Sequence, residues 1–151
     1  MAAIRFGAPA DVPVLVGYWH DMLVECDLIG VGLVANWRAR LEESFRADMD
    51  AGTGVWFVAE HDGRLVGTCT IFRQLGRWNI HRELTGMLAG MYVAPDHRRH
   101  GIARALTERA IAWCTANGCK RVRLQASQNG RSLYESLGFV TATEMMRLDL
   151  S

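Results

Sequence analysis

The chain has 151 residues, of which 50% are hydrophobic and 22% are charged, and its formal net charge is +1. Such a length and composition are typical of one compact globular domain, so we expect a single domain spanning residues 1–151. With 17 basic and 16 acidic residues, the chain lacks the strong positive field that holds many phosphates. This balance argues against a nucleic-acid-binding protein.

The first residues contain early prolines and no long apolar run, so we expect neither a signal peptide nor a membrane-spanning helix. The four cysteines are scattered, with no CxxC pair and no zinc-ligand spacing; they are Cys26, Cys69, Cys114 and Cys119. We therefore expect free, mostly buried thiols, no metal site and a cytoplasmic protein.

The first half of the chain predicts a strand, two helices and a hairpin. A short strand is expected over residues 4–6, and helices over 12–28 and 36–49, where apolar residues recur at helical spacing. Strands over 55–59 and 65–72 follow, joined by a turn at Asp62-Gly63. The polar stretch 73–83 is expected to be a loop.

The second half begins with a predicted strand over residues 84–93. Gly86 and Gly90 interrupt this strand, which indicates a bulge or the close approach of a ligand. A helix over 101–117, a strand over 121–126, a short helix over 133–137 and one or two strands within 139–150 complete the chain. The order β-α-α-β-β-β-α-β-α-β predicts an α+β or α/β mixture around one sheet.

The segment from Val93 to Leu106 carries the clearest chemical signal. A strand ends there, a basic turn follows, and a helix begins at Gly101. The first amides of a helix lack internal partners and carry partial positive charge, so such an end binds phosphate readily. The alternative is a solvated basic turn before an ordinary helix. The two other common phosphate patterns, GxxxxGK[ST] and a GxGxxG after a strand, are not present.

This segment resembles a known family. Arg98-Arg99-His100-Gly101-Ile102-Ala103 resembles the [QR]-x-x-G-x-[GA] signature of the GNAT (Gcn5-related) N-acetyltransferases, and the Val-Ala-Pro-Asp-His before it is similar to their V-x-P-x-x run. Residues 124–139, which close on Leu-Tyr-Glu-Ser-Leu-Gly-Phe, resemble the family's strand-helix ending. Residues 143–145 are similar to the C-terminal strand of one bacterial subgroup. The resemblance is strong over about 88–146 and covers only strand order before that.

The resemblance implies a mixed, mostly antiparallel sheet flanked by helices. It also implies direct, acetyl-CoA-dependent transfer of an acetyl group to a primary amine of a small molecule or a protein, without a metal. On this reading the strand ending at Val93 and the strand ending at Ala126 splay apart, and Cys69 belongs to the core. The implied cofactor-binding residues are Met91 and Val93, toward pantetheine, and Arg98, Arg99, His100, Gly101, Ile102, Ala103 and Arg104, toward the pyrophosphate.

Tyr134 matches the tyrosine that many family members place near the thioester sulfur. The resemblance implies that its phenol protonates the leaving CoA thiolate. The alternative is a core aromatic that packs beside Leu133 and Leu137. Many members have Asn where Ser127 stands, although Ser can still cap the next helix.

The general base stays open among Glu83, His81 and water. For the acceptor, Asp21 and Glu25 lie four residues apart on one helical face and would favour a cationic amine. The alternative is a solvated acidic face. Trp19, Trp37 and Trp78 would add an aromatic wall, although core packing suits the first two equally well.

Two other functions compete with the enzyme. One is a catalytically inactive acyl-CoA-binding module of the same fold. The other is a nucleic-acid-binding protein that uses five arginines, namely Arg98, Arg99, Arg104, Arg121 and Arg123. The oligomeric state also stays open, and the resemblance allows a homodimer.

Overall fold

The structure is a computed structural model that describes residues 2–30, 32–75, 84–142 and 146–150. Its strands are β1 (Ala3–Phe6), β2 (Gly54–His61), β3 (Arg64–Leu75), β4 (Leu84–Val93) and β5 (Cys119–Leu124). Its α-helices are α1 (Val12–Glu25), α2 (Trp37–Ala51), α3 (Ile102–Ala116) and α4 (Arg131–Ser136). Short 3-10 turns are η1 (Pro9–Asp11) and η3 (Pro95–His97). Within these ranges, no helix has the length and apolar character needed to cross a membrane.

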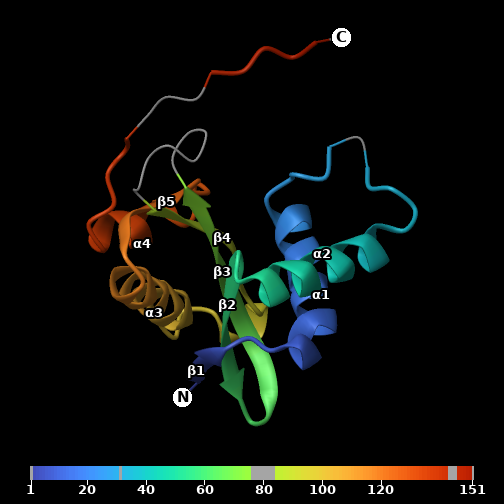
Figure 1. Cartoon of the computed structure of the whole chain (residues 1–151), viewed down its shortest axis with the longest axis horizontal. Coiled ribbons are helices and arrows are strands. Elements are labelled where there is room, and N and C mark those ends of the chain that lie inside the picture. Colours follow the sequence, from blue (N-terminus) through green and yellow to red (C-terminus); the bar gives the residue numbers. More distant parts are fainter. Residues whose placement is uncertain (1, 31, 76–83, 143–145, 151) are drawn as a thin grey trace.

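The five strands form one sheet in the order β1-β2-β3-β4-β5. The pairs from β1 to β4 are antiparallel, and β5 pairs with β4 in parallel. Helices α1 and α2 cover one face of the sheet, and α3 and α4 lie on the other (Figure 1). This confirms the predicted α+β fold with a mixed, mostly antiparallel sheet.

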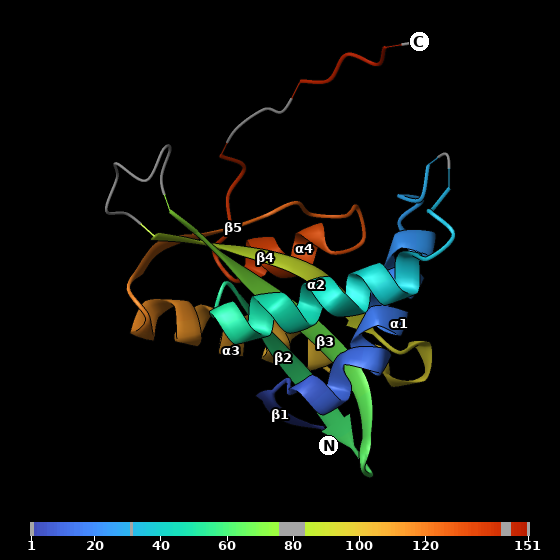
Figure 2. The ribbon, with the colours of Figure 1, turned by 45° about the vertical axis from the view of Figure 1, so that its right-hand side comes forward.

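Each face of the sheet has its own core, because apolar side chains alternate between the two faces of a strand. On the α3 side, Phe57, Ile71 and Leu106 are almost fully buried together. On the side of α1 and α2, Leu15 and Trp56 are buried in a second cluster. Figure 2 shows α1 and α2 lying together across the sheet. Both helix pairs are therefore held by apolar burial on opposite faces of the same strands.

Strands β4 and β5 separate partway along their length. Their pairing ends at Leu88 and Leu124, whereas β4 continues to Val93. Gly90 has a φ of 63° and lies where the β3–β4 register shifts between Thr68 and Thr70. Glycine adopts this φ without strain because it has no side chain, and an extra residue in one strand bends that strand. The predicted bulge at Gly90 is thus confirmed, and it lies in the unpaired part of β4.

Two strand boundaries differ from the predictions. Residues 73–75, predicted as the start of a loop, belong to β3 and pair with residues 84–86 of β4. Strand β5 begins at Cys119 and ends at Leu124 rather than Ala126. It starts directly after Gly118, whose φ of 81° ends α3 as predicted.

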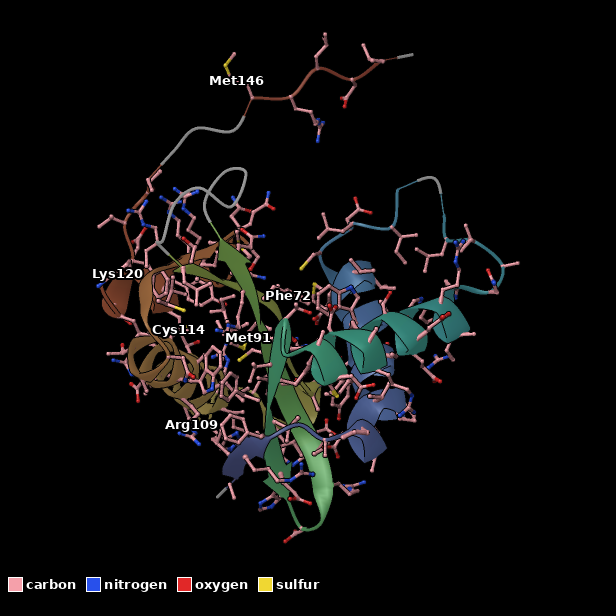
Figure 3. All side chains as sticks on the ribbon, in the orientation of Figure 1. Phe72, Met91, Arg109, Cys114, Lys120 and Met146 are labelled. Atoms are coloured by element: carbon pink, nitrogen blue, oxygen red, sulfur yellow. The ribbon has the colours of Figure 1, made fainter. Side chains whose placement is uncertain are left out.

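The predicted closing strands within 139–150 are wrong for the described residues of that segment, 139–142 and 146–150, which form no strand. Their apolar side chains have no sheet partner: Val140, Met146, Leu148 and Leu150 are 82–92% exposed. Figure 3 shows Met146 on an extended segment away from the sheet. A strand needs hydrogen bonds to a neighbour, so a strand-like pattern alone cannot produce one.

The four cysteines are free thiols, as predicted. Cys69 and Cys114 are buried, Cys119 is partly buried and Cys26 is exposed. Burial raises the pKa of Cys114 to about 12 and raises that of Cys69 further. Both buried thiols are therefore protonated near neutral pH, which suits a core role for Cys69.

Candidate active site

The connection between β4 and α3 leaves several backbone amides without partners. Arg99 has a φ of 64° and Gly101 a φ of 75°, so the chain turns sharply before the helix. The first helical bond runs from the Ala105 N–H to the Gly101 carbonyl at 3.0 Å, which leaves the amides of residues 101–104 without helical partners. A side chain at Gly101 would meet no atom within 4 Å, so the backbone there faces open space. This end of α3 can accept an anion.

The side chain of Arg98 binds other residues of the protein and is not free to bind a ligand. Its guanidinium forms a two-pronged ion pair with Glu25 at the end of α1, at 2.6 and 2.9 Å, and its Nε donates to the Val93 carbonyl at 2.8 Å. It also lies 5.4 Å from the centre of the Tyr92 ring. Sequence reasoning missed this ion pair because the two residues are 73 positions apart. Arg98 therefore ties α1 to the end of β4, and Glu25 carries no uncompensated charge.

The other basic residues of the turn differ in whether their side chains are free to bind an anion. Arg104 is paired with Glu108 at 3.0 Å and donates to the Ser136 hydroxyl at 3.0 Å. Arg99 and His100 are exposed beside the free amides. Thus the positive charge left over at this turn comes mainly from Arg99 and from the helix end itself.

Met91 and Val93 lie in the part of β4 that has separated from β5. Ala94 donates its N–H to the Val66 carbonyl of β3, at 2.8 Å, whereas the Val93 carbonyl receives the Arg98 Nε. The Val93 carbonyl retains one lone pair for a further donor. Met91 is partly buried, and Figure 3 places it near the middle of the sheet. An extended ligand could pair with β4 along this stretch, in the manner of an added strand.

Tyr134 lies in the α3-side core together with Val93 and Ile102, so the fold brings it close to both the open strand and the turn. It is 8% exposed, and its ring centre lies 5.7 Å from that of Phe139. Burial raises its pKa to about 12, with a smaller effect of Cys69. Within the described part of the chain its hydroxyl makes no hydrogen bond. This phenol is therefore a protonated donor without an internal acceptor.

Ser127 lies in the turn that precedes the helix carrying Tyr134. Its hydroxyl accepts the Gly130 N–H at 3.2 Å and its carbonyl accepts the Arg131 N–H at 3.1 Å. The N-cap of that helix is Gly130, with no side-chain cap hydrogen bond, so the predicted Ser127 cap is wrong. The candidate bases Glu83 and His81, together with Trp78, lie outside the described residues.

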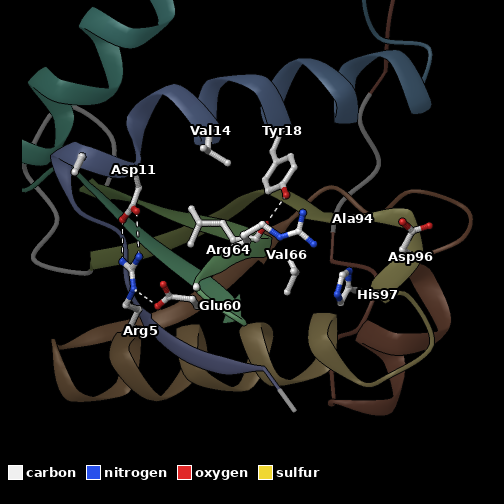
Figure 4. Close-up of a pocket in the computed structure, with 13 residues that line it drawn as sticks. Arg5, Asp11, Val14, Tyr18, Glu60, Arg64, Val66, Ala94, Asp96 and His97 are labelled. Atoms are coloured by element: carbon white, nitrogen blue, oxygen red, sulfur yellow. Dashed lines mark hydrogen bonds and ion pairs between the residues drawn. The ribbon is translucent and has the colours of Figure 1, made fainter.

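A cavity of about 530 Å³ lies between α1 and the β2–β3 hairpin, and Ala94, Asp96 and His97, just before the turn at the start of α3, also line it (Figure 4). Arg5 binds both Asp11, at 2.8 Å, and Glu60, at 3.0 Å, along its wall, and the hydrogen bond from Arg5 lowers the pKa of Asp11. The Nδ1 of His97 is buried without a partner there. No predicted site residue lines this cavity. The ion pairs of Arg5 join β1 to η1 and to β2 instead.

The arrangement can hold an elongated ligand with an anionic end. The open edge of β4 offers backbone groups, the start of α3 offers amides, and Tyr134 offers a proton donor to the ligand's far end. Among the described residues, no group of three or more His, Cys, Asp or Glu side chains is placed to hold a metal ion.

Comparison with known proteins identifies the family to which the chain belongs. The pattern of the Acetyltransferase (GNAT) family matches residues 17–139, which is most of the chain. The chain belongs to the GNAT family. Curated relatives of this GNAT protein are named N-acetyltransferases, and both the turn before α3 and the open part of β4 lie within the matched residues.

Its curated relatives act on different amines. It is 30% identical over 107 residues to the glucosamine 6-phosphate N-acetyltransferase of Trypanosoma brucei brucei, covering 69% of this chain and 72% of that one. Over 55 residues it is 38% identical to an aminoglycoside N(6')-acetyltransferase type 1 from Acinetobacter genomosp. 13, covering 34% and 38%. Among solved structures, a predicted acetyltransferase with acetyl-CoA from Clostridium acetobutylicum has a TM-score of 0.84 at 22% identity, covering 99% of this chain and 96% of that one.

Proposed function

We propose that this GNAT protein transfers an acetyl group from acetyl-CoA directly to a primary amine. The observation that carries the proposal is the separation of β4 from β5 beside the free amides at the start of α3. Acetyl-CoA supplies an acetyl thioester on a long, polar arm that ends in phosphates. Those two features of the fold fit the arm and the phosphates, respectively.

In this proposal the backbone does most of the cofactor binding. Met91 and Val93 pair with the pantetheine arm, and the amides from Arg99 to Arg104, which include His100, Gly101, Ile102 and Ala103, receive the pyrophosphate. The Arg98 N–H already donates to the Pro95 carbonyl at 3.3 Å. The Arg98 side chain positions the end of β4 rather than the phosphates, because Glu25 and the Val93 carbonyl already hold it. Arg99 supplies the free cation beside the amides.

Tyr134 assists the departure of the sulfur. Its raised pKa, about 12, keeps the hydroxyl protonated across the working range. Full transfer of its proton to a thiolate with a pKa of ~8.5 would be uphill by about 5 kcal/mol. We therefore propose that the Tyr134 hydroxyl donates a hydrogen bond to the sulfur as negative charge grows on it. The amine loses one proton when the amide forms, and the CoA thiolate gains one, so the reaction is balanced. Direct transfer also agrees with the buried, protonated state of Cys69, which makes it a poor nucleophile.

The competing functions have less support. Arg98 and Arg104 are ion-paired, which weakens the case for a basic surface that binds nucleic acid. An inactive acyl-CoA-binding module would have no use for a buried phenol without an internal acceptor. The deciding measurement is CoA release from acetyl-CoA with a panel of primary amines. Binding of acetyl-CoA without release for any amine would favour the inactive module, and no binding at all would remove the proposal.

A further inference from the structure

A second cavity, of about 340 Å³, lies between α1 and α2 and under the connection that joins them. Its lining residues are Trp19, His20, Leu23, Leu33, Val34, Trp37, Arg40, Leu41 and Ser44. The size is at the lower end of ligand pockets, which hold small molecules or one part of a larger one.

Trp19 connects this cavity to the open part of β4. A side-chain carbon at Gly90 would lie 2.5 Å and 2.7 Å from two atoms of the Trp19 indole, so the ring packs directly on the backbone of the bulge. The same ring forms part of the cavity wall. The cavity and the proposed transfer site are therefore separated by the thickness of one side chain, on the sheet face opposite α3.

The walls of the cavity are apolar and aromatic. The imidazole of His20 stacks on the indole of Trp37, with ring centres 4.6 Å apart and planes 15° from parallel. Leu33 and Val34 are 39% and 54% exposed beside the opening, which leaves apolar surface for a ligand to cover.

The charges around the cavity oppose a cationic acceptor. None of its described lining residues is a carboxylate, although Asp21 lies 3.8 Å from the Nδ1 of the lining residue His20. Its one permanently charged lining residue, Arg40, has no ion-pair partner within the described part of the chain. Glu25, which a cationic amine would need, is neutralised by Arg98. A positive, apolar cavity favours an aromatic body with an anionic group and disfavours a polycation.

We propose that the cavity between α1 and α2 binds the acceptor, and that the acceptor is an amphipathic primary amine with an aromatic body and a carboxylate, such as an aromatic α-amino acid. This inference rests on the proposed acetyl transfer and names its substrate class. The aromatic body packs against Trp37 and Leu41, the carboxylate lies at Arg40, and the amine is directed past Trp19 toward Gly90.

The test uses four amines as probes: L-phenylalanine, phenethylamine, kanamycin and glucosamine 6-phosphate. Binding of each is measured by calorimetry, and turnover by CoA release with saturating acetyl-CoA. We expect calorimetry to detect binding of L-phenylalanine. In the turnover assay, its KM should be at least ~10-fold below that of kanamycin, which corresponds to about 1.4 kcal/mol. Phenethylamine, which lacks the carboxylate, should fall between them, and Arg40→Gln should remove its difference from L-phenylalanine.

A matched pair of variants locates the site. Leu33→Asp places a carboxylate in the cavity wall, whereas Leu28→Asp makes the same change in the same connection at a residue that is 63% exposed and does not line the cavity. Leu33→Asp should raise the Kd and the KM for L-phenylalanine about tenfold, as expected for an unpaired charge facing an aromatic ligand. Leu28→Asp should change both less than twofold. Acetyl-CoA affinity should be the same in both variants.

Preference for kanamycin or glucosamine 6-phosphate, with no calorimetric binding of either aromatic amine, would overturn the inference. Equal effects of Leu33→Asp and Leu28→Asp would overturn it as well. If either result is found while the protein still binds acetyl-CoA and acetylates another amine, the proposed acetyl transfer stands and only the acceptor class is wrong. Absence of acetyl-CoA binding in the wild-type protein would instead remove the proposed function itself.

Discussion

At the scale of single residues, Tyr134 has the most distinctive environment among the predicted site residues. Its ring is buried in the α3-side core, yet its hydroxyl has no hydrogen-bond acceptor in the described structure, and its pKa is raised to about 12. Core packing and catalysis are therefore compatible here: the ring packs, and the hydroxyl stays available.

Replacing Tyr134 with Phe keeps the ring and removes the donor. We expect kcat to fall roughly 10²-fold, as for loss of a hydrogen-bond donor to charge that develops in the transition state, while acetyl-CoA affinity stays within about twofold. Single-turnover CoA release and calorimetry measure the two quantities separately. An unchanged single-turnover rate would remove Tyr134 from the chemistry.

The same variant has a predicted effect on alkaline stability. The folded pKa of Tyr134, about 12, lies above the ordinary phenol value of ~10. The protonated form is favoured by folding, so this contribution is fully present below pH ~10 and is lost as pH rises toward 12. Between those pH values the wild-type protein should lose more unfolding free energy than Tyr134→Phe, as measured by urea titration. Parallel pH curves would contradict this assignment.

Gly101 provides a residue-scale test of the anion site. Gly101→Glu places bulk and negative charge beside the free amides, and we expect it to abolish acetyl-CoA binding in calorimetry. Since the φ of 75° strains any other residue, Gly101→Ala is the control: it carries the same strain without the charge. Full binding by Gly101→Glu would mean that the phosphates bind elsewhere.

At the scale of elements, the ion pair between Glu25 and Arg98 joins the end of α1 to the end of β4. The two side chains are 48% and 39% exposed, so solvent screens the pair, and such pairs stabilise proteins by ~0–1 kcal/mol. Arg98 also donates to the Val93 carbonyl, so its loss removes more than the ion pair.

We therefore expect Arg98→Gln to lower the Tm by roughly 2–4 °C and Glu25→Gln to lower it less. Adding Glu25→Gln to Arg98→Gln should have almost no further effect, because the shared contact is already gone. Thermal unfolding of the two single variants and the double variant gives this comparison. Strictly additive losses would show that the two residues act independently.

At the scale of the whole molecule, a ligand that binds only the folded state stabilises it by mass action. Acetyl-CoA at a hundred times its Kd should add ~2.7 kcal/mol, which for this chain length is a rise in Tm of roughly 5–10 °C. The control ligands are NAD and ATP, which also carry adenine and phosphates. A shift with those and none with acetyl-CoA would overturn the cofactor assignment.

Many local features of the fold could be predicted from the sequence alone. The helices, the hairpin at Asp62-Gly63, the bulge at Gly90 and the end of α3 at Gly118 are local features, set by side-chain periodicity and by backbone angles that glycine tolerates. The basic turn before α3 was likewise recognisable, because its residues are contiguous.

Tertiary structure decided what depends on distant residues. The ion pair that occupies Arg98, the buried state of Tyr134 and the contact of Trp19 with Gly90 each join segments far apart in the chain. The segment after Phe139 shows the converse: its sequence predicts one or two strands, yet its described residues form no strand and their apolar side chains stay exposed. Periodicity reports which face of an element is apolar, whereas the partner of that face is chosen only when the whole chain folds.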